Sequence, residues 1–137
     1  MRKIFITILT FIFVFLIIEN KTYFLQRLVF IKGSFNIPKE FKEKIKPNSI
    51  LYITLKNDKG VIFAVKEIIN PKPPLQFEIN HKNVLYPDLI TINAKAQAHI
   101  NTHGNVGEIK VGDIYSEIKN TPIINIRLKI YAEKIKY

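Results

Sequence analysis

The chain of 137 residues contains no cysteine, and its single methionine is the first residue. Without cysteine it can form no disulfide and no thiolate metal site, and a blue-copper site would lack both its Cys and its Met ligand. The five glycines form no phosphate-binding loop. A domain of this size can bury a core without covalent cross-links. The absence of cysteine is compatible with an oxidising compartment but does not require one.

The histidines are equally few, at positions 81, 99 and 103. His99 and His103 are four residues apart, a spacing that suits a metal ion only on a helix, where both side chains share a face. Here the pair falls on the end of an alternating segment and on a turn, so the spacing loses that meaning. We expect His99, on the polar face of its strand, to be exposed to solvent. The sequence therefore predicts no metal site and no cofactor.

No arrangement typical of nucleophilic catalysis is present. Ser34, Ser49 and Ser116 stand in no nucleophile elbow and beside no evident base. Asp113 and Glu117 could form a pair of carboxylates, but a turn cap and a solvated charge are the simpler interpretations. We expect no catalytic residue.

What the chain does have is a strongly apolar start. Arg2 and Lys3 precede a run of apolar residues from Ile4 to Ile18, in which two threonines are the only polar side chains. A basic start followed by such a run is typical of an export signal. Fifteen residues suit a signal peptide and fall slightly short of the roughly 20 that span a bilayer. No small-residue cleavage pattern follows, so we favour an uncleaved anchor over a cleaved signal. The chain then divides into a transmembrane segment, 1–27, and one domain, 28–137.

The net charge of +10 comes from 21 basic and 11 acidic residues. The lysines are scattered among the acidic residues rather than gathered into a stripe with stacking aromatics, which argues against a nucleic-acid interface. A solvated basic surface is the expectation, with attraction to anionic lipid or to an acidic partner left open.

Beyond the apolar run the pattern is that of β-strands. Residues 75–80, 90–101 and 124–133 alternate between apolar and polar side chains, as half-buried antiparallel strands require. Two more strands, 50–56 and 61–68, flank a turn that ends in Gly60. A first strand is expected near 28–35, a short helical segment within 39–46, and at most a poor strand at 114–118. Short strands with turns between them predict an all-β, antiparallel sandwich.

Several short segments occur in a suggestive order. They are Ile31-Lys32-Gly33, Ala64-Val65-Lys66-Glu67, Pro74 to Ile79, Ala98 to Val106, and Gly112-Asp113-Ile114. This series resembles the C-terminal immunoglobulin-like domain of the cytochrome c-type biogenesis protein H (CycH) family. The tetratricopeptide helices that precede that domain in the family are absent here, so the family's capture of substrate does not carry over. The matched signature positions are Gly33, Lys66, Pro74, Phe77, Gly104, Gly112 and Asp113.

The resemblance implies an immunoglobulin-like sandwich of about seven strands behind one transmembrane helix, in the bacterial inner membrane with the domain in the periplasm. It implies a non-enzymatic accessory factor in c-type cytochrome biogenesis, whose partners are maturation subunits or apocytochrome c. The alternative is a general envelope-anchored interaction module unrelated to cytochromes. A small hydrolase or metal carrier would require the three histidines to lie within ligand distance. The candidate contact surfaces are the loops 81–88 and 104–113, with His81, Tyr86, Asp88 and His103.

Overall fold

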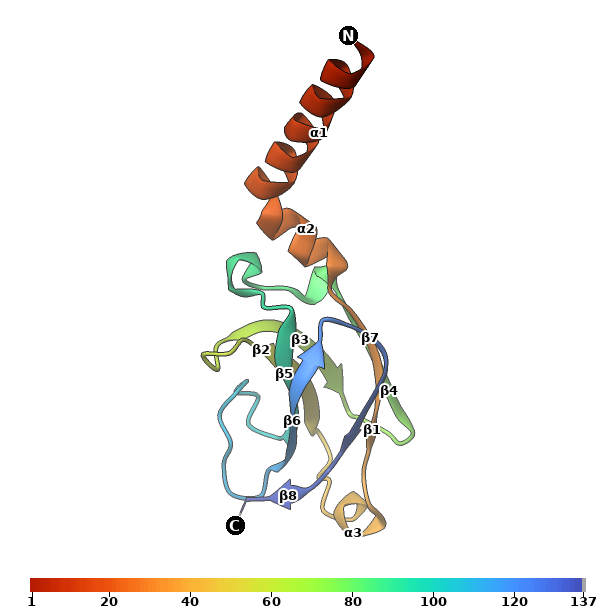
Figure 1. Cartoon of the computed structure of the whole chain (residues 1–137). Helices are drawn as coiled ribbons and strands as arrows, with labels where there is room; N and C mark the ends of the chain where they lie inside the picture. The colour runs from red at the N-terminus through yellow and green to blue at the C-terminus, as the bar shows by residue number, and fades with distance from the viewer. Residues whose placement is uncertain (137) are drawn as a thin grey trace.

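The computed structural model describes residues 1–136, which form a bent pair of helices followed by two β-sheets (Figure 1). The helices are α1 (Arg2–Glu19) and α2 (Lys21–Leu28), with a short α3 (Lys39–Lys42) later in the chain. The strands are β1 (Phe30–Asn36), β2 (Ile50–Lys56), β3 (Ile62–Ile69), β4 (Leu75–Asn80), β5 (Asn93–Asn101), β6 (Ile114–Pro122), β7 (Ile124–Tyr131) and β8 (Lys134–Ile135). Two 3₁₀ turns, η1 (His81–Asn83) and η2 (Pro87–Leu89), lie between β4 and β5. The expected short helical segment within 39–46 is thus confirmed as the single turn α3, whereas the poor strand expected at 114–118 is a full strand.

Every residue of α1 is exposed, although the helix is almost entirely apolar. Its two internal polar side chains bond within the helix, since the hydroxyls of Thr7 and Thr10 donate to the carbonyls of Lys3 and Ile6. At Asn20 the chain bends by 73° into α2. Within residues 1–136, no single helix is both long and apolar enough to cross a membrane. By length and composition, the bent pair together fits a broken span or a signal sequence.

The two sheets have the orders β4-β1-β7 and β3-β2-β5-β6-β8. All strand pairs are antiparallel except β1 and β7, which run parallel. The expected pair of β-sheets behind an N-terminal helical segment is therefore present, although the helical segment is a bent pair, and the expectation of purely antiparallel pairing is wrong. The exception arises because the chain changes sheets between β6 and β7. At that crossing Ile123 donates its N–H to Ile92 and accepts a bond from the N–H of Phe30. Strand β7 therefore starts beside the beginning of β1 and follows it.

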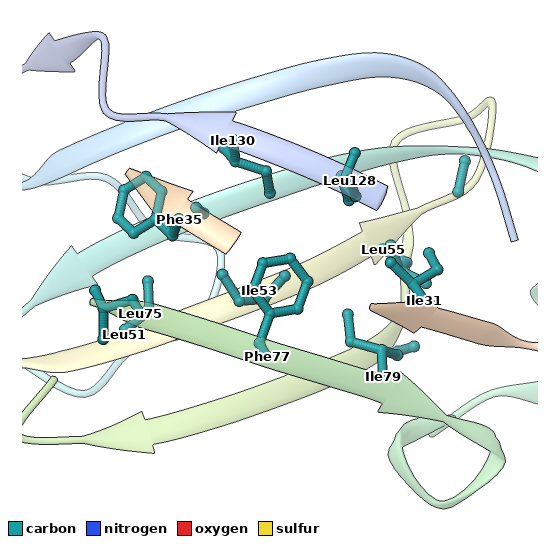
Figure 2. Close-up of a cluster of buried hydrophobic side chains, with 14 of the residues drawn as sticks. Ile31, Phe35, Leu51, Ile53, Leu55, Leu75, Phe77, Ile79, Leu128 and Ile130 are labelled. Carbon is teal, nitrogen blue, oxygen red and sulfur yellow. The ribbon is translucent and has the colours of Figure 1, made fainter. Parts of the chain in front are cut away.

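The core lies between the two sheets and takes side chains from both (Figure 2). The predicted inner face of β4, with Phe77 at its centre, is confirmed. On β7 the inner face is confirmed only from Leu128 onward, because a bulge changes the alternation. Ile31 pairs with Asn125, but Gly33 already pairs with Leu128. The extra residue of β7 turns Ile124 and Ile126 outward, where both are exposed.

Candidate functional site

Polar side chains are buried on the outer face of β5, beneath the segment 102–113. His99, expected on the solvent side, is only 1% exposed, and that expectation is corrected. The side chain does face away from the core, but the segment after β5 folds back over it. Asn101 holds the returning chain by accepting the N–H of Gly104 and donating to the carbonyl of Asn105. Tyr52, paired with His99 across the sheet, donates its hydroxyl to the carbonyl of Gly104.

Asp113 is the centre of this buried cluster. Its Oδ2 atom lies 2.8 Å from Nε2 of His99 and 3.0 Å from Nε2 of His103, and it accepts the backbone N–H of Lys110 at 2.7 Å. The preceding Gly112 has a φ of 92°, which allows the tight turn that brings the carboxylate inward. Burial by itself would raise the pKa of Asp113, but these hydrogen bonds outweigh it and lower the pKa. The carboxylate is therefore charged, and it fastens two distant parts of the loop to β5.

The hydrogen bonds of the two rings define where their protons lie. The backbone N–H of Asn105 donates to Nδ1 of His103 at 3.1 Å, so this nitrogen carries a lone pair and Nε2 carries the proton. Nδ1 of His99 is buried without a partner. Burial lowers the pKa of His99, against the opposing effect of Asp113. Both rings are thus neutral and donate from Nε2 to the same carboxylate oxygen.

The same three side chains are close enough together to hold a metal ion, since their ligand atoms lie within 4.8 Å of one another. A histidine that binds a metal through Nε2 normally donates its Nδ1–H to an acceptor. Here Nδ1 of His103 faces an N–H donor, and Nδ1 of His99 faces no acceptor. The surroundings of both rings therefore favour a proton over a metal ion on each Nε2. The hydrogen bonds of the cluster hold the segment 102–113 in place on β5. His81 is not part of the cluster: it lies in η1, directly after β4 of the other sheet, and Glu117 is exposed on β6.

An apolar groove of about 450 Å³ lies on the outer face of the five-stranded sheet. One wall is Leu85 and Tyr86, held along the edge of β3 by backbone N–H bonds to the carbonyl of Phe63. The opposite wall is Val106 of the segment 102–113. The full lining is Tyr52, Ile62, Val65, Glu67, Leu85, Tyr86 and Val106. Burial raises the pKa of Tyr52, and the charge of Glu67 raises it further, so its hydroxyl keeps its proton.

The two loops that the sequence singled out as separate contact surfaces thus meet in one groove, through Tyr86 and Val106. The other candidate residues do not join them. His103 belongs to the buried cluster, Asp88 is exposed in η2, and the His81 carbonyl accepts a bond from Gln26 of α2. The sequence did not predict Leu85 and Val106 individually as groove residues. Its only indication was that each is an apolar residue in a segment rich in turns.

The signature positions have structural surroundings of several kinds. Gly33 is packed under the ring of Phe77, and Asp113 is the centre of the cluster. Gly104 and Gly112 both have positive φ in the covering loop. Lys66 lies on β3 opposite Ile53, and Pro74 precedes β4 after a cis bond to Pro73.

Comparison with known proteins assigns no family. No protein-family model matches the chain, and no curated protein matches its sequence. Among solved structures, an alternative pilotin from the type II secretion system of Vibrio cholerae is similar, with a TM-score of 0.48 and 13% identity. The match covers 77% of this chain and 96% of the pilotin chain. At that level the similarity carries neither a family nor a function.

Proposed function

We propose that this chain is a membrane-anchored module of the bacterial cell envelope that binds a protein partner and catalyses no reaction. The observation that carries the proposal is α1, an apolar helix of 18 residues with none of them buried. So large an exposed apolar surface is stable only in lipid or against another protein.

The dimensions and charges of the helix pair suit a bilayer, although α1 alone does not reach across it. Eighteen residues at 1.5 Å each make about 27 Å, slightly short of the hydrocarbon thickness of about 30 Å, and α2 continues the pair from there into the interface. Both internal hydroxyls are satisfied within the helix, as a lipid environment demands. Arg2 and Lys3 at the start favour a cytoplasmic N-terminus, which leaves the two-sheet domain in the periplasm on the outer side of the inner membrane.

The groove is the surface best suited to a partner. It combines exposed aliphatic and aromatic side chains, Leu85, Tyr86 and Val106, on two segments that are hydrogen-bonded to the sheet. Tyrosine beside aliphatic residues is typical of the residues that dominate protein interfaces. The polar groups near it do not form a reactive site, because the Asp113 cluster is buried and engaged in holding the loop. A protein segment that inserts one large apolar side chain is the ligand that this groove fits.

A narrower proposal follows from the sequence resemblance. In it the domain is an immunoglobulin-like sandwich that assists c-type cytochrome biogenesis, and its partner is a maturation subunit or apocytochrome c. Its support is the ordered series of signature residues, among which Gly33 and Phe77 pack against each other. The broader proposal, an envelope interaction module of another system, needs only the anchor and the groove.

A photo-crosslinking experiment in cells tests both forms. A photoreactive amino acid replaces Leu85 or Val106 in the full-length chain. Val111, which is exposed in the same segment 102–113 but does not line the groove, serves as the matched control. We expect one envelope protein to be crosslinked from both groove positions and not from Val111. Maturation subunits or apocytochrome c would support the narrower proposal. Equal labelling from all three positions would contradict the groove.

A further inference from the structure

Apolar side chains are exposed at the end of the domain that adjoins α2. On the helix itself these are Tyr23, Phe24 and Leu28. Directly beyond it lie Ile92, 68% exposed, and Ile124, which are brought together by the bonds of Ile123 to Ile92 and Phe30. We call these five residues the membrane-facing end. Neither the groove nor the buried cluster includes any of them.

Helix α2 is fixed to the domain by its opposite face. Gln26 donates its side-chain amide to the carbonyl of His81, and Leu25 packs against the core. The residues on either side of this pair, Phe24 and Arg27, remain exposed. In Figure 1 the domain lies below α2 and α1 lies above it. The exposed aromatic face is therefore turned away from the domain, toward the region that α1 occupies.

The bend at Asn20 decides how this face meets a bilayer. If α1 crosses the membrane near its normal, a bend of 73° lays α2 nearly parallel to the membrane plane. Only Asn20 separates the two helices, so α2 begins at the level of the lipid headgroups. A helix in that position with aromatic and aliphatic residues on its outer face is arranged like an interfacial helix.

The chemistry of the surface matches that level of the bilayer. Tyrosine is enriched at the boundary between hydrocarbon and water. The guanidinium of Arg27 lies 5.2 Å from the centre of the Tyr23 ring, and Lys21 and Lys82 are exposed nearby on α2 and η1. Basic residues beside an apolar surface attract anionic lipid headgroups.

We propose that the membrane-facing end binds the surface of the phospholipid bilayer, so that the domain is held against the membrane instead of moving freely on its anchor. This inference rests on the proposed function for α1 and adds a lipid-binding surface on the domain itself. Ile92 and Ile124 distinguish a lipid-binding surface on the domain from the anchor alone, because neither residue belongs to the anchor and both would contact lipid.

The chain contains no tryptophan, so the fluorescence of a single introduced tryptophan reports the depth of that one side chain in the bilayer. Phe13→Trp in α1, Ile92→Trp and Ile124→Trp at the membrane-facing end, and Val111→Trp as the control are each made in the full-length protein. Val111 is 75% exposed in the loop 102–113. It adjoins Gly112, whose N–H bonds to the carbonyl of Lys136 just after β8, and β8 lies at the end of the domain away from α2 (Figure 1). Each variant is reconstituted in vesicles of phosphatidylcholine and phosphatidylglycerol whose acyl chains are brominated near the headgroup or near the terminal methyl.

We expect tryptophan at position 13 to be quenched most by the deep bromines. At positions 92 and 124 we expect quenching by the shallow bromines to be at least about twice that of the Val111→Trp control. Quenching at position 13 with no excess at either 92 or 124 would overturn the proposed lipid surface and leave the anchor intact. No quenching at position 13 would overturn the anchor, and with it both proposals. The two isoleucine variants are independent, and each is accepted only if its circular dichroism matches that of the unchanged chain.

Discussion

Replacing Gly33 with alanine would place a methyl group where the core has no room for one. Gly33 lies in the middle of β1, paired with Phe77 on one side and Leu128 on the other. Its neighbours Ile31 and Phe35 face the core, and the Phe77 ring fills the space that a side chain of Gly33 would take. The added Cβ would lie 2.6 Å from Cζ of Phe77 and 2.6 Å from the carbonyl oxygen of Leu128. The φ of Gly33 is not in the left-handed region, so the effect is one of space alone.

The two contacts differ in how far they can yield. Carbon atoms attract best at about 3.5–4.0 Å, so the ring would have to retreat by about 1 Å. The carbonyl belongs to the backbone of β7 and is held by the pairing with β1. Overpacking of a core costs roughly 1–3 kcal/mol. We expect a loss in the upper half of that range, about 2–3 kcal/mol of unfolding free energy, which corresponds to a fall of about 10 °C in melting temperature.

Thermal unfolding of the full-length chain in detergent, followed by circular dichroism of the sheets, measures the effect. Gly60→Ala is the control, since Gly60 has a φ of 80° and open space around its Cβ position; its cost is conformational, about 1 kcal/mol. Adding Phe77→Leu to Gly33→Ala removes the ring contact but not the carbonyl contact. The double variant should therefore be more stable than the sum of its parts predicts, by about 0.5 kcal/mol or more. Additive losses, or a Gly33→Ala variant within about 0.5 kcal/mol of the unchanged chain, would refute the packing argument.

Three further predictions concern the buried cluster. Because the pKa of His99 is lowered on folding, the unfolded chain binds its proton first as pH falls below about 6.5; stability should then decrease with falling pH, at up to about 1.4 kcal/mol per unit. His99→Gln should flatten the melting temperature between about pH 7 and pH 5, and an unchanged slope would show that another group titrates. Asp113→Ala leaves three donors without their acceptor, so we expect a loss of about 2–3 kcal/mol and faster hydrogen exchange at the Lys110 amide; slow exchange there would show that the loop is held by other contacts. Excess Zn²⁺ should leave the melting temperature unchanged, because the surroundings of the two Nδ1 atoms keep the ring protons on Nε2, where a metal ion would have to bind; a rise that disappears in His103→Ala would contradict this.

The parts of the fold that the sequence predicts well depend on local pattern. The hairpin around Gly60 was expected from two apolar runs and a turn, and β2 and β3 occupy those runs to within one residue. The inner face of β5, from Ala94 to Ile100, follows from its alternation and is confirmed. Ile92, predicted on the same face, lies before the strand and is exposed, so that part of the prediction is wrong. For β5 the period of two is enough, because one face of the strand packs against the core.

What could not be predicted depends on segments distant in the chain. The alternation of β5 places His99 on the outer face correctly, but it contains nothing about the loop that returns to cover that face. The outward turn of Ile126 requires a bulge that is defined only by the pairing with β1. The groove likewise needs Tyr86 and Val106, which are distant in the sequence, to be brought to the same face of one sheet. Each of these features is set by tertiary packing, which a single-sequence pattern does not contain.

The parallel pairing of β1 and β7 has a mechanical consequence. Strand β1 follows α2 directly and is bonded on both sides, to β4 and to β7, while β8 lies at the far end of the molecule (Figure 1). A force that pulls the helices away from that far end would pull β1 and β7 in opposite directions along their common axis. The evenly spaced bonds of a parallel pair would then be strained together rather than opened one after another. Tension arriving through the helices would thus meet the domain at the place where its resistance to forced unfolding is concentrated.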